Sequence, residues 1–270
     1  MAKHDLLTED EFANYKPPKK AVKQLEKYTA SRGLPPGQIK VLDWGCGRGR
    51  FVLGLREKGY DAFGVDIDME PVQNGQPLFA AKGHKGNYLS VLEPDGKTKH
   101  IDGFFDFVMT DNVLEHVSDL PKVVAEINRV TSSKGAGYHI FPAQRQPLEG
   151  HLFMPFVHWF PKNGFRKTLI RRCVKNGREP HWIEVENAAL EKKTEVYYQY
   201  SVEHLFYRPY KQIKKVFEEG GFLVEVLSLQ NPAVQGHKIL GPLARIRITR
   251  PLIQWLVTTF KQVELLSLRK

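Results

Sequence analysis

Cysteine is scarce in this chain, and long apolar runs are missing from it. Cys46 and Cys173 are the only cysteines among 270 residues, too few for a disulfide framework, so the sequence predicts a reducing compartment. Residues 1–12 contain acids and lack an apolar core, which argues against a secretory signal there. No run approaches the roughly 18 apolar residues of a membrane-spanning helix. We therefore expect a cytoplasmic protein whose contact with a membrane is at most peripheral.

Acidic residues are outnumbered, because 40 lysines and arginines stand against 30 aspartates and glutamates. Residues 161–180 and residues 237–270 concentrate this excess, and each segment contains seven cations and one acid. Scattered lysines would indicate no more than a solvated surface. One-sided segments favour an anionic acceptor or an anionic surface, either a membrane or nucleic acid. With 41% hydrophobic residues, the chain can also bury the core of one full domain.

A glycine-rich turn follows a short apolar run near the start of the chain. The sequence from Val41 to Phe51 reads VLDWGCGRGRF. It predicts a buried strand, a tight turn that exposes the backbone, and the start of a helix. A dinucleotide-binding turn needs a glycine where this chain has Arg50. The acid at the strand end, Asp43, would repel a pyrophosphate, but it can pair with a cationic group such as an ammonium.

A second acid stands at the end of the next predicted strand. Asp66 lies 21 positions after Gly45, where a carboxylate can accept hydrogen bonds from the two hydroxyls of a ribose. The alternative interpretation is that Asp43 and Asp66 are ordinary turn residues at strand ends. That alternative requires both acids and all three glycines to coincide by chance.

A third motif lies between Phe105 and Val117, which read FDFVMTDNVLEHV. It predicts a fourth strand and its exit, followed by a helix capped by Asp119 with Pro121 in its first turn. Together, the three motifs resemble the class I S-adenosylmethionine (SAM) methyltransferases, in particular the type 11 and type 23-like small-molecule enzymes. The resemblance covers residues 36–142, with a fainter echo over residues 201–229.

This resemblance implies an α/β Rossmann-like fold with a mostly parallel, seven-stranded sheet, helices on both faces and a cap inserted after strand five. It also implies SAM as cofactor. The residues carried over to the cofactor site are Asp43, Gly45, Cys46, Gly47, Gly49, Asp66, Ile67, Asn87, Tyr88, Asp111 and Asn112. Asn87 departs from the family, which commonly has an aspartate there, so its contact with adenine would lack a charge.

The chain divides into five predicted segments. Residues 1–35 form an N-terminal helical segment, residues 36–142 the SAM-binding core, and residues 143–200 a cap that recognises the acceptor. Residues 201–250 complete the fold, with an antiparallel last strand over residues 244–249. Residues 251–270 are expected to form an amphipathic helix, which packs on the domain or lies on an anionic membrane.

Aromatic residues and histidines gather in the cap between Gly150 and Pro161. His151, His158 and Trp159 are the candidates for acceptor recognition, and the alternative is an apolar loop that only covers the sheet. The histidines lack the spacing of metal ligands and have no partnering acid pattern, so no metal is expected.

His116 is the candidate catalytic base, because it follows strand four and an imidazole titrates near neutral pH. The alternative is a structural histidine that bonds to the backbone, in which case His151 and His158 remain open as bases.

Three functions stay open at this point. The first is O-methylation of a small molecule, a sugar or a lipid-linked intermediate by in-line methyl transfer from SAM. The second is methylation of RNA or other nucleic acid, with the basic segments on phosphates. The third is a scaffold subunit without catalysis. The identity of the acceptor is not readable from the sequence.

Overall fold

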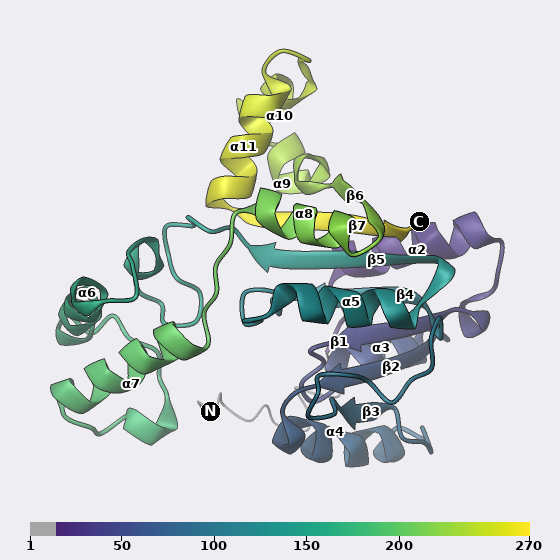
Figure 1. Ribbon diagram of the computed structural model, residues 1–270, viewed down its shortest axis with the longest axis horizontal. Helices are drawn as coiled ribbons and strands as arrows, with labels where there is room; N and C mark the ends of the chain where they lie inside the picture. The colour runs from purple at the N-terminus through teal and green to yellow at the C-terminus, as the bar shows by residue number, and fades with distance from the viewer. Residues whose placement is uncertain (1–14) are drawn as a thin grey trace.

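Seven strands form the central sheet of the computed structural model, which describes residues 15–270 (Figure 1). Their order across the sheet is β3-β2-β1-β4-β5-β7-β6. Strands β1 to β5 pair in parallel, and β7 pairs antiparallel with both β5 and β6. The predicted mostly parallel sheet of seven strands is therefore confirmed. The strands are β1 (Lys40–Trp44), β2 (Asp61–Asp66), β3 (Leu89–Val91), β4 (Phe105–Asp111), β5 (Thr131–Pro142), β6 (Phe222–Val226) and β7 (Gln262–Arg269).

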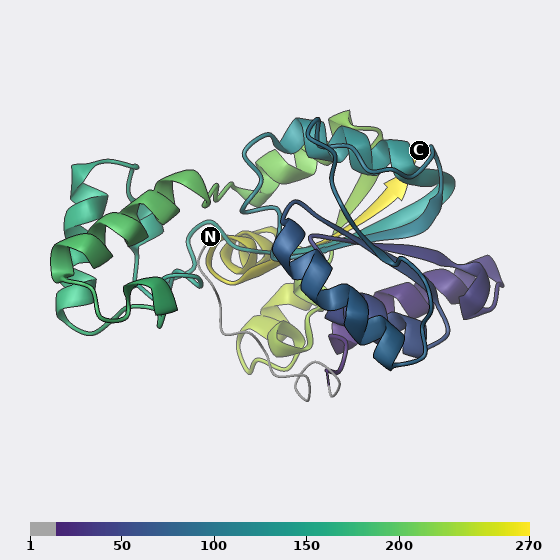
Figure 2. The same ribbon diagram turned by 90° about the horizontal axis from the view of Figure 1, so that it is seen from below.

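Helices cover both faces of this sheet (Figure 2). Successive residues of a strand point to opposite faces, so Val41 joins one apolar core and Leu42 joins the other. The first core packs against α2 (Lys19–Arg32), α3 (Arg50–Glu57) and α4 (Met69–Ala81), and the second against α5 (Leu120–Val130) and α8 (Tyr210–Glu219). Burial on both faces explains why these strands read as continuous apolar runs.

Local signals set the ends of these helices as predicted. The Asp119 side chain accepts from the backbone N–H of Lys122 at 3.1 Å and caps α5, and Pro121 follows in the first turn. Gly59, with φ of +86°, follows the end of α3, where a left-handed conformation favours glycine.

The cap is a helical lobe at the carboxyl end of β5, although its sequence shows no clear helical period. It contains η2 (Val157–Trp159), α6 (Gly164–Lys175), η3 (Ile183–Val185) and α7 (Leu190–Glu203). Its own apolar cluster includes Leu152, Ile170, Trp182 and Tyr197, so it packs internally. Figure 1 shows the lobe standing beside the sheet, at the edge where β5 ends.

The C-terminal prediction is wrong in two places. Residues 244–249, expected as the antiparallel strand, belong to the end of α10 (Leu240–Arg245) and to the turn before α11 (Arg250–Phe260). Residues 251–270 were expected to form one helix, but α11 ends at Phe260 and β7 follows it. Val263 and Leu265 stand two residues apart, so they point to the same face of β7 and join the core under α5 and α8, while the strand pairs with β5 and β6. Two short elements, η4 (Ser228–Gln230) and α9 (Pro232–Gln235), precede α10, and η1 (Pro36–Gln38) precedes β1.

A buried carboxylate on β7 ties the N-terminal helix to the sheet. Glu264 accepts from the Tyr138 hydroxyl at 2.7 Å and from the Asn231 amide at 2.6 Å. The Lys20 ammonium on α2 lies 3.0 Å from the same carboxylate. One side chain thereby joins α2, β5 and the loop after β6.

We expect Glu264→Ala to destabilise the fold by about 3–5 kcal/mol, because it leaves buried polar partners unpaired. Lys20→Ala is the matched control. Its side chain is 37% exposed, and its removal should cost less than about 1 kcal/mol. The free energy of unfolding in urea measures both, and equal losses in the two variants would contradict this role of Glu264.

Candidate active site

The loop between β1 and α3 presents its backbone at the carboxyl edge of the sheet. Gly45, Gly47 and Gly49 have positive φ values of 82°, 52° and 78°. A Cβ on Gly45 would collide with the Val113 side chain, and a Cβ on Gly49 would stand 2.6 Å from Leu89 Cδ2. At Gly47, no heavy atom of the described residues lies within 4 Å of that position. The loop is thus packed on two sides and open at Gly47, which suits a ligand held against the backbone.

Asp66 ends β2 beside this loop and is held by the backbone. One carboxylate oxygen accepts from the Gly47 N–H at 2.7 Å and the other from the Asp68 N–H at 3.0 Å. The next side chain, Ile67, is 77% exposed and offers an apolar surface next to the carboxylate. A nucleoside fits this arrangement, because its ribose hydroxyls can donate to the Asp66 carboxylate and its base can pack on Ile67.

Asp43 is buried at the end of β1, and its surroundings are acidic. Burial, followed by the negative charges of Asp111 and Asp66, raises the pKa of Asp43 to about 8. Cys46 and Tyr15 also face this carboxyl. No ion pair among residues 15–270 neutralises Asp43, so a cationic ligand group would be stabilised here. The carboxylates of Asp43 and Asp66 can accept hydrogen bonds, as the ammonium and the ribose hydroxyls of SAM require.

Tyr15 is a site residue that the sequence analysis missed. Its ring lies 4.9 Å from the guanidinium carbon of Arg50, the first residue of α3. Burial, followed by the charge of Asp43, raises its pKa to about 12. Pro17 packs onto α3, since a Cβ on Gly54 would stand 2.5 Å from its ring. A lone tyrosine in a segment without periodicity gives no signal, so only the fold reveals it.

Asn87 and Tyr88 do not reach this edge, contrary to the prediction. Asp66 pairs with Val91 in the sheet, so the residues that follow Val91 lie at the carboxyl edge. Asn87 precedes β3 and lies toward the other end of the strand. Tyr88 packs instead under Arg56, whose guanidinium carbon stands 3.6 Å from its ring. The sequence motif was aligned with the wrong end of β3, because the strand begins only at Leu89.

Asp111 and Asn112 lie at the carboxyl end of β4, as predicted. The Asn112 amide donates to the Asp111 carboxylate at 2.8 Å, and Asn112 has a φ of +53°. This left-handed residue turns the chain so that Val113 packs on Gly45. The segment that continues through Glu115 and His116 is thereby fixed against the glycine loop.

The cap brings two histidines together beside this segment. His116 Nε2 and His151 Nε2 lie 3.0 Å apart. His116 Nδ1 bonds to the His204 carbonyl at 2.7 Å, and His151 Nδ1 bonds to Glu149 at 2.9 Å. Both ring nitrogens of His116 are therefore engaged, which agrees with the backbone-bonded alternative better than with a lone base. The expectation that these histidines lack an acidic partner is wrong.

Glu149 is the acid that sequence reasoning overlooked. It is fully buried and accepts from the Tyr207 hydroxyl at 2.5 Å, as well as from His151 and the backbone N–H groups of His151 and Leu152. Its position two residues before His151 was the available signal. Tyr207 lies in the segment between α7 and α8. It is too far from Glu149 along the chain for any sequence motif to connect the two residues.

His158 and Trp159 lie apart from that pair. Burial lowers the pKa of His158 to about 4, and its ring packs on Tyr207 with centroids 4.7 Å apart. Trp159 lies on a groove of about 760 Å³ in the cap, whose lining includes Phe156, Phe160 and Leu169. The three predicted acceptor residues thus lie at three places: His151 in the histidine pair, Trp159 in the aromatic groove, and His158 in a third groove lined also by Tyr207 and Arg208.

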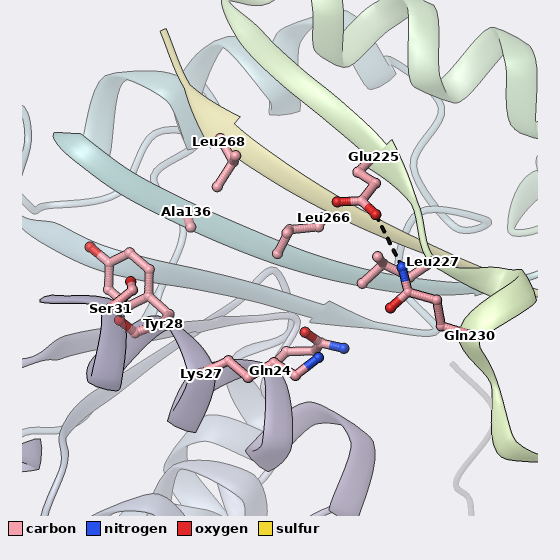
Figure 3. Close-up of a pocket in the computed structure, with 10 residues that line it drawn as sticks. All are labelled: Gln24, Lys27, Tyr28, Ser31, Ala136, Glu225, Leu227, Gln230, Leu266 and Leu268. Atoms are coloured by element: carbon pink, nitrogen blue, oxygen red, sulfur yellow. Dashed lines mark hydrogen bonds between the residues drawn. The ribbon is translucent and has the colours of Figure 1, made fainter.

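Figure 3 shows a different groove, of about 240 Å³, between α2 and strands β5, β7 and β6. Within it the Gln230 amide donates to Glu225 at 3.0 Å, and the Tyr28 hydroxyl donates to the Lys134 carbonyl at 3.0 Å. Ala136 and Leu268 lie toward the amino ends of the parallel strands, away from Asp43 and Asp66. This groove therefore has no part in the site at the carboxyl edge.

Comparison with known proteins gives a family match for part of the chain. Residues 42–138 match a family described as a methyltransferase domain. Ubiquinone biosynthesis O-methyltransferase of Pectobacterium carotovorum is 31% identical over 102 residues, 38% of this chain and 41% of that protein. Ajmaline N-methyltransferase of Rauvolfia serpentina is 34% identical over 95 residues, 34% of this chain and 32% of that protein. The chain thus spans less than half the length of both curated relatives.

Solved structures share the fold at low sequence identity. A SAM-dependent methyltransferase from Aquifex aeolicus superimposes with a TM-score of 0.51 at 14% identity, covering 98% of this chain and 100% of that one. PKMT2 from Rickettsia typhi, solved in complex with AdoHcy, gives 0.54 at 16% identity, covering 87% and 50%. Residues 42–138 therefore match a methyltransferase domain, and the chain shares its fold with solved SAM-dependent methyltransferases.

Proposed function

We propose that this protein transfers the methyl group of SAM to a hydroxyl oxygen of a small molecule, a sugar or a lipid-linked intermediate. The observation that carries the proposal is the contact between Val113 and Gly45, which places the histidine pair of the cap next to the cofactor loop. Relatives include O- and N-methyltransferases, so the choice of oxygen rests on the polar, buried cluster rather than on similarity.

The cofactor roles follow from the charges at the carboxyl edge. Asp43 takes the ammonium of SAM, Asp66 the ribose hydroxyls and Ile67 the adenine face, while Gly47 leaves room for the chain between them. SAM supplies a methyl group already activated on a sulfonium. The protein then has mainly to align the acceptor oxygen with that methyl, and such alignment supplies most of the rate.

A basic groove beside the histidine pair supports an acceptor that carries an anionic group. It measures about 270 Å³, and its lining includes Lys162, Arg166, Arg208 and Tyr207 and no acid. Burial is the first cause that lowers the pKa of each of the three cations. An anion in the groove would offset the loss of hydration.

Nucleic acid is the weaker alternative, because acids of α7 neutralise part of the basic segment in the cap. Lys167 pairs with Glu195, and Arg171 pairs with Glu191 at 3.2 Å. These pairs interrupt the track of free cations that a phosphate backbone would need.

The affinity for S-adenosylhomocysteine should rise with pH between about 6 and 8. Asp43 is protonated below its pKa of about 8, and the arriving ammonium favours the carboxylate, so binding releases a proton. Each pH unit below 8 should weaken binding by up to about tenfold. Calorimetry over this range measures the slope.

Asp43→Asn should bind weakly and without this slope, whereas Asp95→Asn, at an exposed acid, should keep it. A flat profile for the unmodified protein would reject the assignment of the ammonium to Asp43.

A labelled methyl group tests the acceptor class directly. We expect protein supplied with labelled SAM and a cell extract to label lipid, glycan or small-molecule fractions. His151→Ala should lower that labelling by about 100-fold without changing S-adenosylhomocysteine affinity, because it misplaces the acceptor rather than the cofactor. His181→Ala removes an exposed cap histidine and serves as the control. Label in RNA, or none despite cofactor binding, would replace this function with the nucleic-acid or scaffold alternative.

Contact with an anionic membrane surface forms the second part of the proposal. No described helix has the length and apolarity to cross a bilayer. The projecting pair α10 and α11 (Figure 1) instead exposes Ile246, Ile248, Leu252 and Trp255, with exposed cations beside them at Lys238, Arg245, Arg247 and Arg250. None of these four cations forms an ion pair within residues 15–270. Apolar side chains ringed by free cations suit a lipid surface of negative charge.

The double variant Leu252→Glu and Trp255→Glu should bind vesicles containing phosphatidylserine at least about tenfold more weakly, since two apolar insertions are lost. Vesicle sedimentation measures this change. Leu223→Glu alters an exposed leucine on β6 and should have no effect. Equal binding of the double variant and the unmodified protein, or equal binding to uncharged phosphatidylcholine vesicles, would exclude this surface.

A further inference from the structure

One carboxylate beside the histidine pair has no partner. Glu115 is 3% exposed, and neither of its oxygens finds a hydrogen-bond donor among residues 15–270. The basic-side-chain nitrogen that comes within 4.0 Å of its Oε1 in the described chain is His151 Nε2. A buried carboxylate without donors is costly, so this position indicates a missing cation or donor.

The tautomers of the two histidines follow from their outer partners. The His204 carbonyl can only accept, so His116 carries its proton on Nδ1. The Glu149 carboxylate likewise draws the proton of His151 to Nδ1. In the neutral rings both Nε2 lone pairs then face each other at 3.0 Å, an arrangement that needs a positive charge between them.

We propose that Glu115, His116 and His151 bind one divalent transition-metal ion of the zinc class. Their ligand atoms all lie within 4.8 Å of one another. Two imidazoles and one carboxylate are zinc ligands, each with metal distances of about 2.0–2.2 Å, so nitrogens 3.0 Å apart can share an ion. Imidazoles disfavour magnesium and calcium, which prefer oxygen.

Charge balance separates a metal from a proton as the occupant. Two buried carboxylates, Glu115 and Glu149, surround the pair. A shared proton would leave one negative charge uncompensated, whereas a divalent ion neutralises both. Glu149 would act from the outer shell by orienting His151, and the His204 carbonyl would do the same for His116.

Three protein ligands leave a coordination position open, as in zinc sites that bind a reactant. Val113 stands two residues before Glu115 and packs on Gly45, so the site adjoins the cofactor loop. An ion there lowers the pKa of a bound hydroxyl. Metal binding itself does not rest on the proposed function, and it is measured without any methyl acceptor.

The test is calorimetric titration of the chelator-treated, full chain with Zn²⁺ and with Mn²⁺. We expect one Zn²⁺ per chain, bound more tightly than Mn²⁺, with binding lost in His151→Ala. Glu149→Gln should weaken Zn²⁺ by about 10–100-fold through the outer shell. His181→Ala and Cys173→Ala should bind as the unmodified chain does, which separates this site from exposed histidine and from thiol.

Glu115→Gln gives a second readout, the melting temperature, which remains informative even if a variant loses metal binding for an unrelated reason. It keeps the side-chain shape and removes the buried charge, so the metal-free variant should melt at a higher temperature than the metal-free parent. It should also lose the rise in melting temperature that Zn²⁺ gives the parent. S-adenosylhomocysteine binding by the same samples reports on the methyltransferase site independently.

The proposal is overturned if the unmodified chain binds no Zn²⁺, or if Glu115→Gln and His151→Ala bind it unchanged. It is also overturned if Cys173→Ala removes the binding. Absent metal binding with intact S-adenosylhomocysteine binding would identify a proton as the occupant and leave the proposed function standing.

Discussion

Buried carboxyl groups without a cationic partner among residues 15–270 are the constraint on which this site depends. Asp43 lies near the end of β1 among other acids, and Glu115 lies a few residues beyond β4, with no hydrogen-bond donor in the described part of the chain. The fold tolerates both, although each costs stability until a cation arrives. SAM carries an ammonium and a sulfonium, and a divalent ion carries two charges. In the proposed site, these two positions would favour cationic ligands, one at the glycine loop and one beside residues 111–116.

That segment couples the two halves of the chemistry mechanically. Asn112 has a left-handed conformation, Val113 packs against Gly45, and the Glu115 carbonyl accepts from the Phe206 N–H at 2.6 Å. The glycine loop (residues 45–49), the segment after β4 (residues 112–116) and the segment that follows the cap (residues 204–207) thus lie next to one another in that order. A shift at any of them moves the acceptor side relative to the methyl donor, and alignment is what methyl transfer needs most.

The sequence predicted the sheet, the glycine loop and the two strand-end acids, because each depends on short-range order along the chain. The prediction failed at residues whose position depends on contacts between segments that are far apart in the sequence. Asn87 was assigned to the wrong end of β3, since the start of a three-residue strand leaves little pattern. Residues 262–269 read as a helix because alternation and helical spacing overlap over a few apolar positions. Tyr207 and Tyr15 meet the site through the fold alone, whereas Glu149 had a signal in its position two residues before His151.

The aromatic groove of the cap and the exposed tip of α10 and α11 help to distinguish between the proposed acceptors. The cap opens an aromatic groove at Phe156 and Trp159, and Trp159 lies near Phe260 at the end of α11, with ring centroids 6.4 Å apart. The apolar, basic tip of α10 and α11 begins from that same helix. A lipid-linked acceptor could keep its apolar part along this aromatic path while its polar head enters the histidine cluster. A free sugar would need only the cluster and the basic groove, so the aromatic path favours the lipid-linked member of the proposed class.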